Sequence, residues 1–587
     1  MSAFSLVFNR NGTPIEQSVI RSMQRAFQDY GGALTVERPL PHLLVIHWHD
    51  DSRERPGHFE STSQGGFLVL DAVGKTAKPS SLDRRQSLIR DKPNYYDCSP
   101  PYVVISWLKD KLVLARDPLG RRALWFASVG HTIIAGSEPG LVLAHQNVTK
   151  EPDLNIVAER LASRPTTIHG SVYKAIRSVG ADERITFSEY ATTHEKLNSI
   201  CVNTDSKKDT QQWASELTRT IEIAINSHFE KEITGGLAVS LSGGLDSSCL
   251  AGLVSNFKDK RKLALGTLRY PGLNCDESSY QNAVIKKSGI RSQNFNHRLV
   301  DPESDLFEYT KRSQTPVQRV DTGEMDLQRW CSAQNFTHLM IGTGGDELFE
   351  YLPYTFANNV AGGNFIKACR QLKRNGIAHE LRSAVPYAPR KLRSFMRKYR
   401  IPEWITTDLA KRTRLWERLE KNTTLHNRVG GVSQRLDYLN NSAHLQIALE
   451  AFEYRSRECG INFVEPFKDL NLVRLMLSMP NEIRSMEGDP RAIQRFTFQQ
   501  YLPEAVMNRR GKARFDEPLA QNFAQPWCRD LLRSSILVRE GLVERTALMA
   551  LHARIESQLK TNPSEVRGTL ALWRIIGIEV WWRVNYS

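Results

Sequence analysis

Residues 242–248 read S-G-G-L-D-S-S, and the residues on either side predict a strand, a glycine loop and a helix. Gly243 and Gly244 allow backbone conformations that other residues avoid, and they let a ligand approach the main chain closely. A helix N-terminus presents unpaired N–H groups, which bind anions and phosphate in particular. The loop therefore predicts a phosphate site made by Ser242, Gly243, Gly244, Asp246, Ser247 and Ser248.

Asp246 is the unexpected member of this loop, because a carboxylate repels phosphate unless a cation lies between them. Mg²⁺ is held by carboxylate and phosphate oxygens together and resolves that conflict. The alternative interpretation is a tight strand–helix turn capped by its own serine and aspartate. The loop is neither a Walker A motif nor a G-x-G-x-x-G fingerprint.

A second loop of the same kind follows the apolar residues from 338 to 341. It contains Gly344 and Gly345 and then Asp346. Ligands of a doubly wound sheet gather at the carboxyl ends of its strands, so Asp246 and Asp346 are predicted to clamp one Mg²⁺. Acidic residues that only favour a helix N-terminus are the alternative. Asp276 and Glu277 follow another predicted strand and are expected to cap the next helix.

The chain has 587 residues, which predicts more than one domain. Residues 1–205 are rich in short β-like runs, 201–212 are polar and read as a linker, and 213–587 form the second predicted domain. Strands are expected at 236–241, 262–268, 294–300 and 337–341, alternating with helices, and the chain beyond 350 is mostly helical. This alternation predicts an α/β domain with a parallel sheet.

Several classes of protein are excluded by composition. We find no apolar run of about 18 residues, so no membrane span is expected. The first residues lack a signal-peptide pattern, and the eight cysteines form no C-x-x-C pair, so reduced thiols and a cytoplasmic location are expected. Much of the net charge of +15 lies in 367–400. We interpret that stretch as amphipathic helices with a basic face, with a peptide-docking surface as the alternative, and expect no nucleic-acid partner.

Downstream, four further patterns occur in the order P-F-x-D (466–469), G-D-P-R-x-x-x-R (488–495), L-P (502–503) and R-x-K-x-x-F (510–515). Together with the two loops, they make residues 215–587 resemble the synthetase domain of the asparagine synthetase family, in the ATP pyrophosphatase superfamily. The resemblance implies a doubly wound parallel α/β domain with a helical extension, and ATP with Mg²⁺ as cofactors. It also implies that Lys512 contacts the phosphates and stabilises charge as an acyl-adenylate forms and reacts. A surface lysine in a basic run is the alternative.

The N-terminal part resembles the class II glutamine amidotransferase scaffold at 114–127 and 135–138. This implies an αββα sandwich of the Ntn-amidotransferase type. Members that use glutamine begin Met-Cys, whereas this chain has Ser2, a poorer nucleophile at neutral pH. The family's N-G-E segment is also missing. We therefore expect a degenerate domain without glutaminase activity, so the amine must come from elsewhere.

Two branches of the family, β-lactam synthetases and lasso-peptide cyclases, use an amine of the substrate itself. Thr343 stands where asparagine synthetases carry Glu and β-lactam synthetases carry Tyr, so neither role carries over. Residues 401–405 and 570–585 resemble lasso cyclases. The expected reaction joins a peptide Asp or Glu side chain to the peptide's N-terminal amine as a macrolactam and releases AMP and pyrophosphate. The expected partners are a precursor peptide, a leader peptidase and a leader-recognition protein.

Three alternatives stay open at this point. Within the same class they are a β-lactam synthetase and an ammonia-dependent amide ligase. From another class, the alternative is a non-catalytic scaffold that binds nucleotide or precursor peptide. The joint presence of Asp246, Asp346 and Lys512 disfavours the scaffold.

Overall fold

A computed structural model describes residues 2–587 except 31, 50–56, 63–64, 71–100, 109, 198–199, 201–206, 229–234, 258, 319–320, 350–359, 361–362, 364, 376–400, 426–442, 485–488, 490 and 510.

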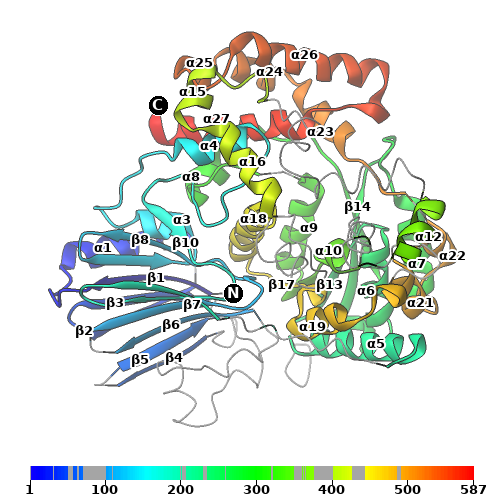
Figure 1. Cartoon of the computed structure of the whole chain (residues 1–587), viewed down its shortest axis with the longest axis horizontal. Helices are drawn as coiled ribbons and strands as arrows, with labels where there is room; N and C mark the ends of the chain where they lie inside the picture. Colours follow the sequence, from blue (N-terminus) through cyan, green and yellow to red (C-terminus); the bar gives the residue numbers. More distant parts are fainter. Residues whose placement is uncertain are drawn as a thin grey trace.

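Two antiparallel sheets form the N-terminal part of the molecule (Figure 1). The first has the strand order β10-β8-β9-β1-β3-β2, with bounds β1 (Ser2–Asn9), β2 (Ala33–Leu40), β3 (Leu43–His49), β8 (Trp125–Val129), β9 (Thr132–Gly136) and β10 (Ile176–Ser178). The second has the order β12-β11-β7-β6-β5-β4, with bounds β4 (Gly57–Thr62), β5 (Gly65–Leu70), β6 (Val103–Leu108), β7 (Lys111–Arg116), β11 (Glu183–Phe187) and β12 (Thr192–Lys196).

Alternation of side chains along β1 explains how these sheets pack. Phe4, Leu6 and Phe8 belong to a core shared with residues of the second sheet, such as Ile105 and Leu114. The residues between them point to the opposite face, as the period of two of a strand requires. That face is covered by α1 (Gln17–Arg25), α3 (Pro139–Leu143) and α4 (Leu154–Leu161).

A parallel sheet forms the centre of the C-terminal part. Its order is β15-β14-β13-β16-β17, with bounds β13 (Leu237–Leu241), β14 (Leu263–Arg269), β15 (Ser292–Asn296), β16 (His338–Met340) and β17 (Asn462–Val464). The chain leaves β13 towards β14 and β15 and later returns to the other side of β13 as β16. The carboxyl ends of β13 and β16 therefore form the topological switch point, where ligands bind in such sheets.

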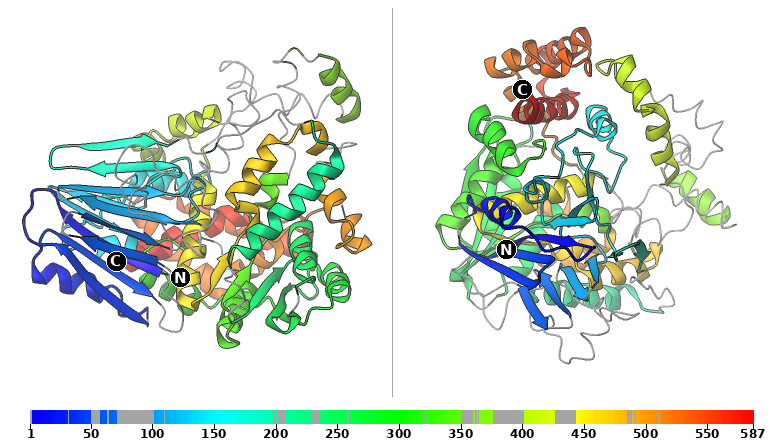
Figure 2. Two further views of the ribbon diagram at one scale, coloured as in Figure 1. Left: turned by 90° about the horizontal axis from the view of Figure 1, so that it is seen from below. Right: turned by 90° about the vertical axis from the view of Figure 1, so that its left-hand side faces the viewer.

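Helices cover both faces of the parallel sheet (Figures 1 and 2). One core joins the sheet to α5 (Thr210–Asn226), α6 (Leu245–Val254), α7 (Ser278–Ser288), α19 (Leu470–Ser478) and α21 (Ala492–Phe498). The core on the other face includes residues of α9 (Thr322–Ala333), and α18 (Ala443–Cys459) packs against it. In Figure 1, α18 lies between the antiparallel sheets and the parallel sheet. The predicted α/β fold class is confirmed: a sandwich of two antiparallel sheets is followed by a doubly wound domain with a parallel sheet and helices on both of its faces.

A helical extension completes the C-terminal part. Its main helix, α27 (Thr569–Tyr586), packs against α4, and Trp581 Nε1 donates to Tyr173 Oη at 3.0 Å. The remaining helices are α8 (Tyr309–Ser313), α10 (Gly345–Phe349), α12 (Phe365–Asn375), α15 (Thr407–Arg412), α16 (Leu415–Leu425), α20 (Asn481–Arg484), α22 (Glu504–Met507), α23 (Asp516–Phe523), α24 (Pro526–Arg533), α25 (Ile536–Arg539) and α26 (Arg545–Thr561).

Three sequence predictions need correction. The strand expected at 294–300 lies at Ser292–Asn296, because Val300 N donates to Asn522 Oδ1 at 2.7 Å instead of to a neighbouring strand. The short strand β17 was not predicted. The end of the predicted linker is helical, because Asp209 and Gln212 form a capping box at the start of α5.

Two other features bear on the sequence predictions. Of the basic stretch, α12 is described, and 376–400 lie outside the described residues. No helix in the described part of the chain is long and apolar enough to cross a membrane.

Candidate active site

The first loop turns tightly between β13 and α6. Gly243 has φ +86°, in the left-handed region that favours glycine. Ser242 Oγ and Ser247 Oγ lie 3.0 Å apart, and Gly244 N donates to Ser242 Oγ at 3.3 Å. Because the N-cap residue of α6 is Gly244, it has no side-chain oxygen to cap the first turn. The N-terminus of α6 therefore faces the loop with amide groups that suit a phosphate.

The second loop, between β16 and α10, packs directly against the first. A Cβ added to Gly345 would lie 2.4 Å from Asp246 Oδ1, and one added to Gly342 would lie 3.2 Å from Asp246 Cβ. Gly344 has φ +93°, again a conformation that favours glycine. The glycines of this loop thus allow Asp246 and Asp346 to share one small region at the switch point.

Two of the predicted site residues, Asp246 and Asp346, are joined by Arg491, which the sequence did not single out. Arg491 Nη1 donates to Asp246 Oδ1 at 3.0 Å and to Oδ2 at 2.9 Å, and its Nη2 pairs with Asp346. Lys512 Nζ donates to Asp346 Oδ1 at 3.0 Å. Gln494 Nε2 donates to Asp246 Oδ1 at 2.7 Å. Asp246, Asp346 and Lys512 therefore form one charged network around the Arg491 guanidinium.

Arg491 and Gln494 belong to the pattern G-D-P-R-x-x-x-R, which was noticed in the sequence but given no role. The signal that could have identified Arg491 is electrostatic. Two nearby carboxylates need a counter-charge, and an arginine fork is well suited to join them. Only 8% of the Arg491 side chain is exposed, compared with 49% of Asp346, so the guanidinium is enclosed while Asp346 remains accessible to a ligand.

Glu277 has a different role from the predicted one. It occupies the N-cap position of α7 but makes no capping hydrogen bond, so that expectation is wrong. Its carboxylate pairs with Arg509, whose Nη1 also donates to Gly243 O at 3.2 Å. Burial raises the pKa of Glu277, and Arg509 opposes that shift. The pair therefore connects the start of α7 to the backbone of the first loop.

Other predicted residues are placed as follows. Asp276 Oδ1 accepts from Tyr270 N at 2.9 Å, and Asp276 Oδ2 accepts from Ser278 Oγ at 2.6 Å, so it stabilises the turn before α7. Ser248 is fully buried, and its N–H donates to Gly244 O at 3.1 Å. Thr343 is partly buried in the second loop, and Arg510 lies outside the described residues.

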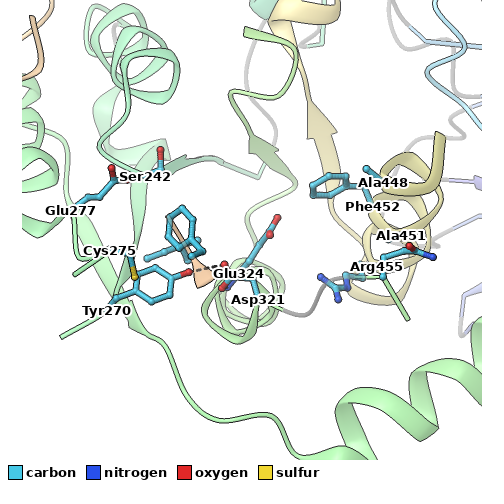
Figure 3. Close-up of a pocket in the computed structure, with 13 residues that line it drawn as sticks. Ser242, Tyr270, Cys275, Glu277, Asp321, Glu324, Ala448, Ala451, Phe452 and Arg455 are labelled. Atoms are coloured by element: carbon cyan, nitrogen blue, oxygen red, sulfur yellow. Dashed lines mark hydrogen bonds between the residues drawn. The ribbon is translucent and has the colours of Figure 1, made fainter. Parts of the chain in front are cut away.

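A cavity of about 340 Å³ adjoins the first loop, within the range of small-molecule sites (Figure 3). Ser242 and Glu277 lie on one side and residues of α18 on the other, with Asp321 and Glu324 between them. Tyr270 Oη donates to Asp321 Oδ2 at 2.7 Å. The lining is formed by Ser242, Leu268, Tyr270, Cys275, Glu277, Gln318, Asp321, Glu324, Ala448, Ala451, Phe452, Arg455 and Phe515.

The opposite side of α18 is attached to the N-terminal part by buried ion pairs. Ala123 N donates to both carboxylate oxygens of Glu453, at 2.9 and 3.0 Å, and Arg122 Nη1 lies 3.8 Å from Glu453 Oε1. One helical turn away, Arg160 Nη2 lies 3.9 Å from Glu450 Oε2. The N-terminal sandwich thus fixes the helix that forms one wall of the cavity.

The site suits Mg²⁺ together with a nucleotide better than Mg²⁺ alone. Within the described ranges, no group of three or more His, Cys, Asp or Glu side chains could hold a metal ion. Mg²⁺ in nucleotide enzymes is commonly held by one or two carboxylates and completed by phosphate oxygens and water. Asp246 and Asp346, on adjoining loops beside the N-terminus of α6, are the two carboxylates that would hold Mg²⁺ in this way.

Comparisons with known proteins identify the family of the chain. The sequence model of the asparagine synthase family matches residues 216–583. Glutamine-hydrolyzing asparagine synthetase 3 of Bacillus subtilis (strain 168) is 21% identical over 425 residues, covering 68% of this chain and 64% of that protein. Glutamine-hydrolyzing asparagine synthetase 1 of the same strain is 20% identical over 523 residues, covering 82% and 77%. The chain thus spans just under two thirds of the length of the first relative.

Solved structures give weaker likenesses. Glutamine phosphoribosylpyrophosphate amidotransferase from B. subtilis, complexed with ADP and GMP, has 10% identity and a TM-score of 0.22, covering 58% of this chain and 81% of that one. The U34-tRNA thiolase NcsA from Methanococcus maripaludis has 15% identity and a TM-score of 0.17, covering 38% and 81%.

Proposed function

This chain belongs to the asparagine synthase family, and from that premise we propose that it is an ATP-dependent amide-forming ligase. In this reaction, a substrate carboxylate attacks the α-phosphate of ATP, pyrophosphate leaves, and an amine then displaces AMP from the acyl-adenylate. The observation that carries the proposal is the assembly of Asp246, Asp346 and Lys512 at the switch point, beside a cavity that Ser242 also lines.

Some residues of the site would bind the nucleotide, and others would stabilise the charge that develops in the reaction. The N-terminus of α6 and the amides of the first loop bind phosphate oxygens. Asp246 and Asp346 would hold Mg²⁺, which neutralises phosphate charge when bound. Lys512 Nζ lies 3.0 Å from Asp346 Oδ1, and 60% of the side chain is exposed, so a phosphate of the bound nucleotide can reach its ammonium group. Preorganised cations at a developing negative charge contribute several kcal/mol to catalysis, typically about 3 kcal/mol each.

For the substrate, we propose the macrolactam reaction of lasso-peptide cyclases on a ribosomally made precursor peptide. Ser2 replaces the cysteine of glutamine-using relatives, and it lies at the start of β1, in register with His49. A supply of ammonia from glutamine is therefore unsupported, and an amine within the substrate replaces it. Joining both groups in one folded peptide makes the second step intramolecular, which raises the effective concentration of the amine. A leader peptidase and a leader-recognition protein are the proposed partners.

An ammonia-dependent ligase is the second candidate, because the relatives found are asparagine synthetases. A β-lactam synthetase, the other alternative within the class, would likewise use an amine of the substrate itself but would close a four-membered ring in a small molecule.

The test uses the full chain, ATP, Mg²⁺ and a leader-free peptide that has a free N-terminal amine and an Asp or Glu side chain. We expect AMP and pyrophosphate to form together with a peptide that has lost one water. Asp246→Asn and Asp346→Asn should abolish AMP formation, whereas Asp326→Asn should not, because Asp326 does not line the cavity. AMP formation with aspartate and ammonia, but not with the peptide, would refute the cyclase assignment and support the second candidate.

A further inference from the structure

The cavity beside the first loop is chemically uneven. Arg491 and Lys512 are next to the two loops, where phosphate and the activated carboxylate would lie. Asp321 and Glu324, by contrast, project from the first turn of α9 into the cavity (Figure 3). The lining also contains Glu277, which pairs with Arg509, and one cation, Arg455. Asp321 and Glu324 therefore outnumber the cation at their end of the cavity, and that end favours a positively charged group.

Each carboxylate also has a role in α9 itself. Asp321 is the N-cap residue, since its Oδ1 accepts from Glu324 N at 3.3 Å, and acidic residues in a first turn favour the helix dipole. Helix stability does not require both carboxylates to line a cavity, however. Asp326 on the same helix pairs with Arg298 at 3.5 Å and with Arg329 at 3.3 Å, and it is not part of the lining.

The rest of the lining is consistent with a peptide. Ala448, Ala451 and Phe452 of α18 form an apolar wall, and the Phe515 ring lies tilted against Tyr270 with ring centroids 5.2 Å apart. Apolar walls with a few placed polar groups are typical of ligand sites. Such walls also exclude water, which strengthens the attraction between a carboxylate and an ammonium group.

Building on the proposed function, we propose that Asp321 and Glu324 form the subsite for the attacking amine, with Glu324 as the proton acceptor. The substrate amine binds to these carboxylates in its protonated, ammonium form. It then gives one proton to Glu324. The nitrogen lone pair then forms the C–N bond to the acyl carbon, the C–O bond to AMP breaks, and AMP leaves. The second proton lost by the nitrogen passes to solvent. Tyr270, through its hydrogen bond to Asp321, positions that carboxylate.

The two half-reactions separate this proposal from the proposed function. Glu324→Gln keeps the shape of the side chain but removes its charge. We expect peptide-dependent exchange of pyrophosphate into ATP to stay within about twofold of wild type, and macrolactam formation to fall by about a hundredfold, the scale of general-base catalysis. Hydroxylamine, which is largely uncharged at neutral pH, should still trap the adenylate as a hydroxamate at the wild-type rate. Raising the pH should restore part of the macrolactam rate, because more of the amine is then neutral.

Asp326→Asn is the matched control on the same helix and should leave both half-reactions unchanged. Glu324→Asp, which keeps the charge, should retain more macrolactam activity than Glu324→Gln. An equal loss of exchange and cyclisation in Glu324→Gln would overturn the inference, because it would place Glu324 in the nucleotide half-reaction. An unchanged macrolactam rate would overturn it as well. If wild-type protein shows no peptide-dependent exchange, the proposed function itself is wrong, and this inference is withdrawn with it.

Discussion

Replacing Glu450 by Gln should change how the stability of the protein depends on pH. Only 11% of the Glu450 side chain is exposed, and its partner Arg160 is 3.9 Å away. Burial raises the pKa of Glu450 from 4.5 to about 7, although Arg160 and Arg116 oppose the shift. The folded protein therefore binds this proton more tightly than the unfolded chain does.

The sign and size of the effect follow from that difference. A raised pKa contributes stability below the pKa of the unfolded chain, and that contribution is lost as the pH rises through the pKa of the folded state. A shift of one pKa unit corresponds to about 1.4 kcal/mol. Ionisation of Glu450 therefore lowers the unfolding free energy of the wild type by up to about 3 kcal/mol between about pH 4 and pH 8. Glutamine is neutral throughout this range, so the Glu450→Gln variant does not lose this stability. The variant should therefore gain stability relative to wild type as the pH rises.

The assay is urea unfolding, followed by tryptophan fluorescence, of wild type and Glu450→Gln at several pH values between about 5 and 8. The difference in unfolding free energy should grow in favour of the variant across this range. Glu458→Gln is the control, because Glu458 lies on the same helix but is 43% exposed and paired with Arg312. Parallel pH profiles for wild type and Glu450→Gln would refute the reasoning and show that this carboxylate is solvated or fully compensated by arginine.

The other predictions concern the candidate active site. Lys512→Met should lower AMP formation by about a hundredfold, about 2.7 kcal/mol, without changing the melting temperature, and Lys512→Arg should also lose most activity; near-wild-type rates for both would remove this lysine from the mechanism. Gly345→Ala should abolish AMP formation in a folded protein, as judged by circular dichroism, because its Cβ would meet Asp246 Oδ1 at 2.4 Å. Ser2→Ala should leave macrolactam formation unchanged, and wild type should release no glutamate from glutamine; glutamate release that depends on Ser2 would contradict the loss of glutaminase activity.

The short-range features of the site could be predicted from the sequence. The glycine loops are encoded by neighbouring residues, and their conformations depend on the backbone freedom of Gly243 and Gly344. The alternation of strands and helices is also a local property, and it predicted the parallel sheet and its ligand-binding edge. Asp246 and Asp346 could therefore be placed near each other from the topology alone.

The tertiary structure decided which residues complete the site. Arg491 reaches Asp246 across 245 positions of sequence, and no local pattern records such a contact. Glu277 was expected to cap a helix, but folding places it beside Arg509, so it forms an ion pair instead. The acidic end of the cavity arises in the same way, because Tyr270 and Asp321 come from separate elements that meet only when the sheet is formed. Local geometry is set by neighbouring residues, whereas the partner of a buried charge is set by whatever the fold brings within reach of it.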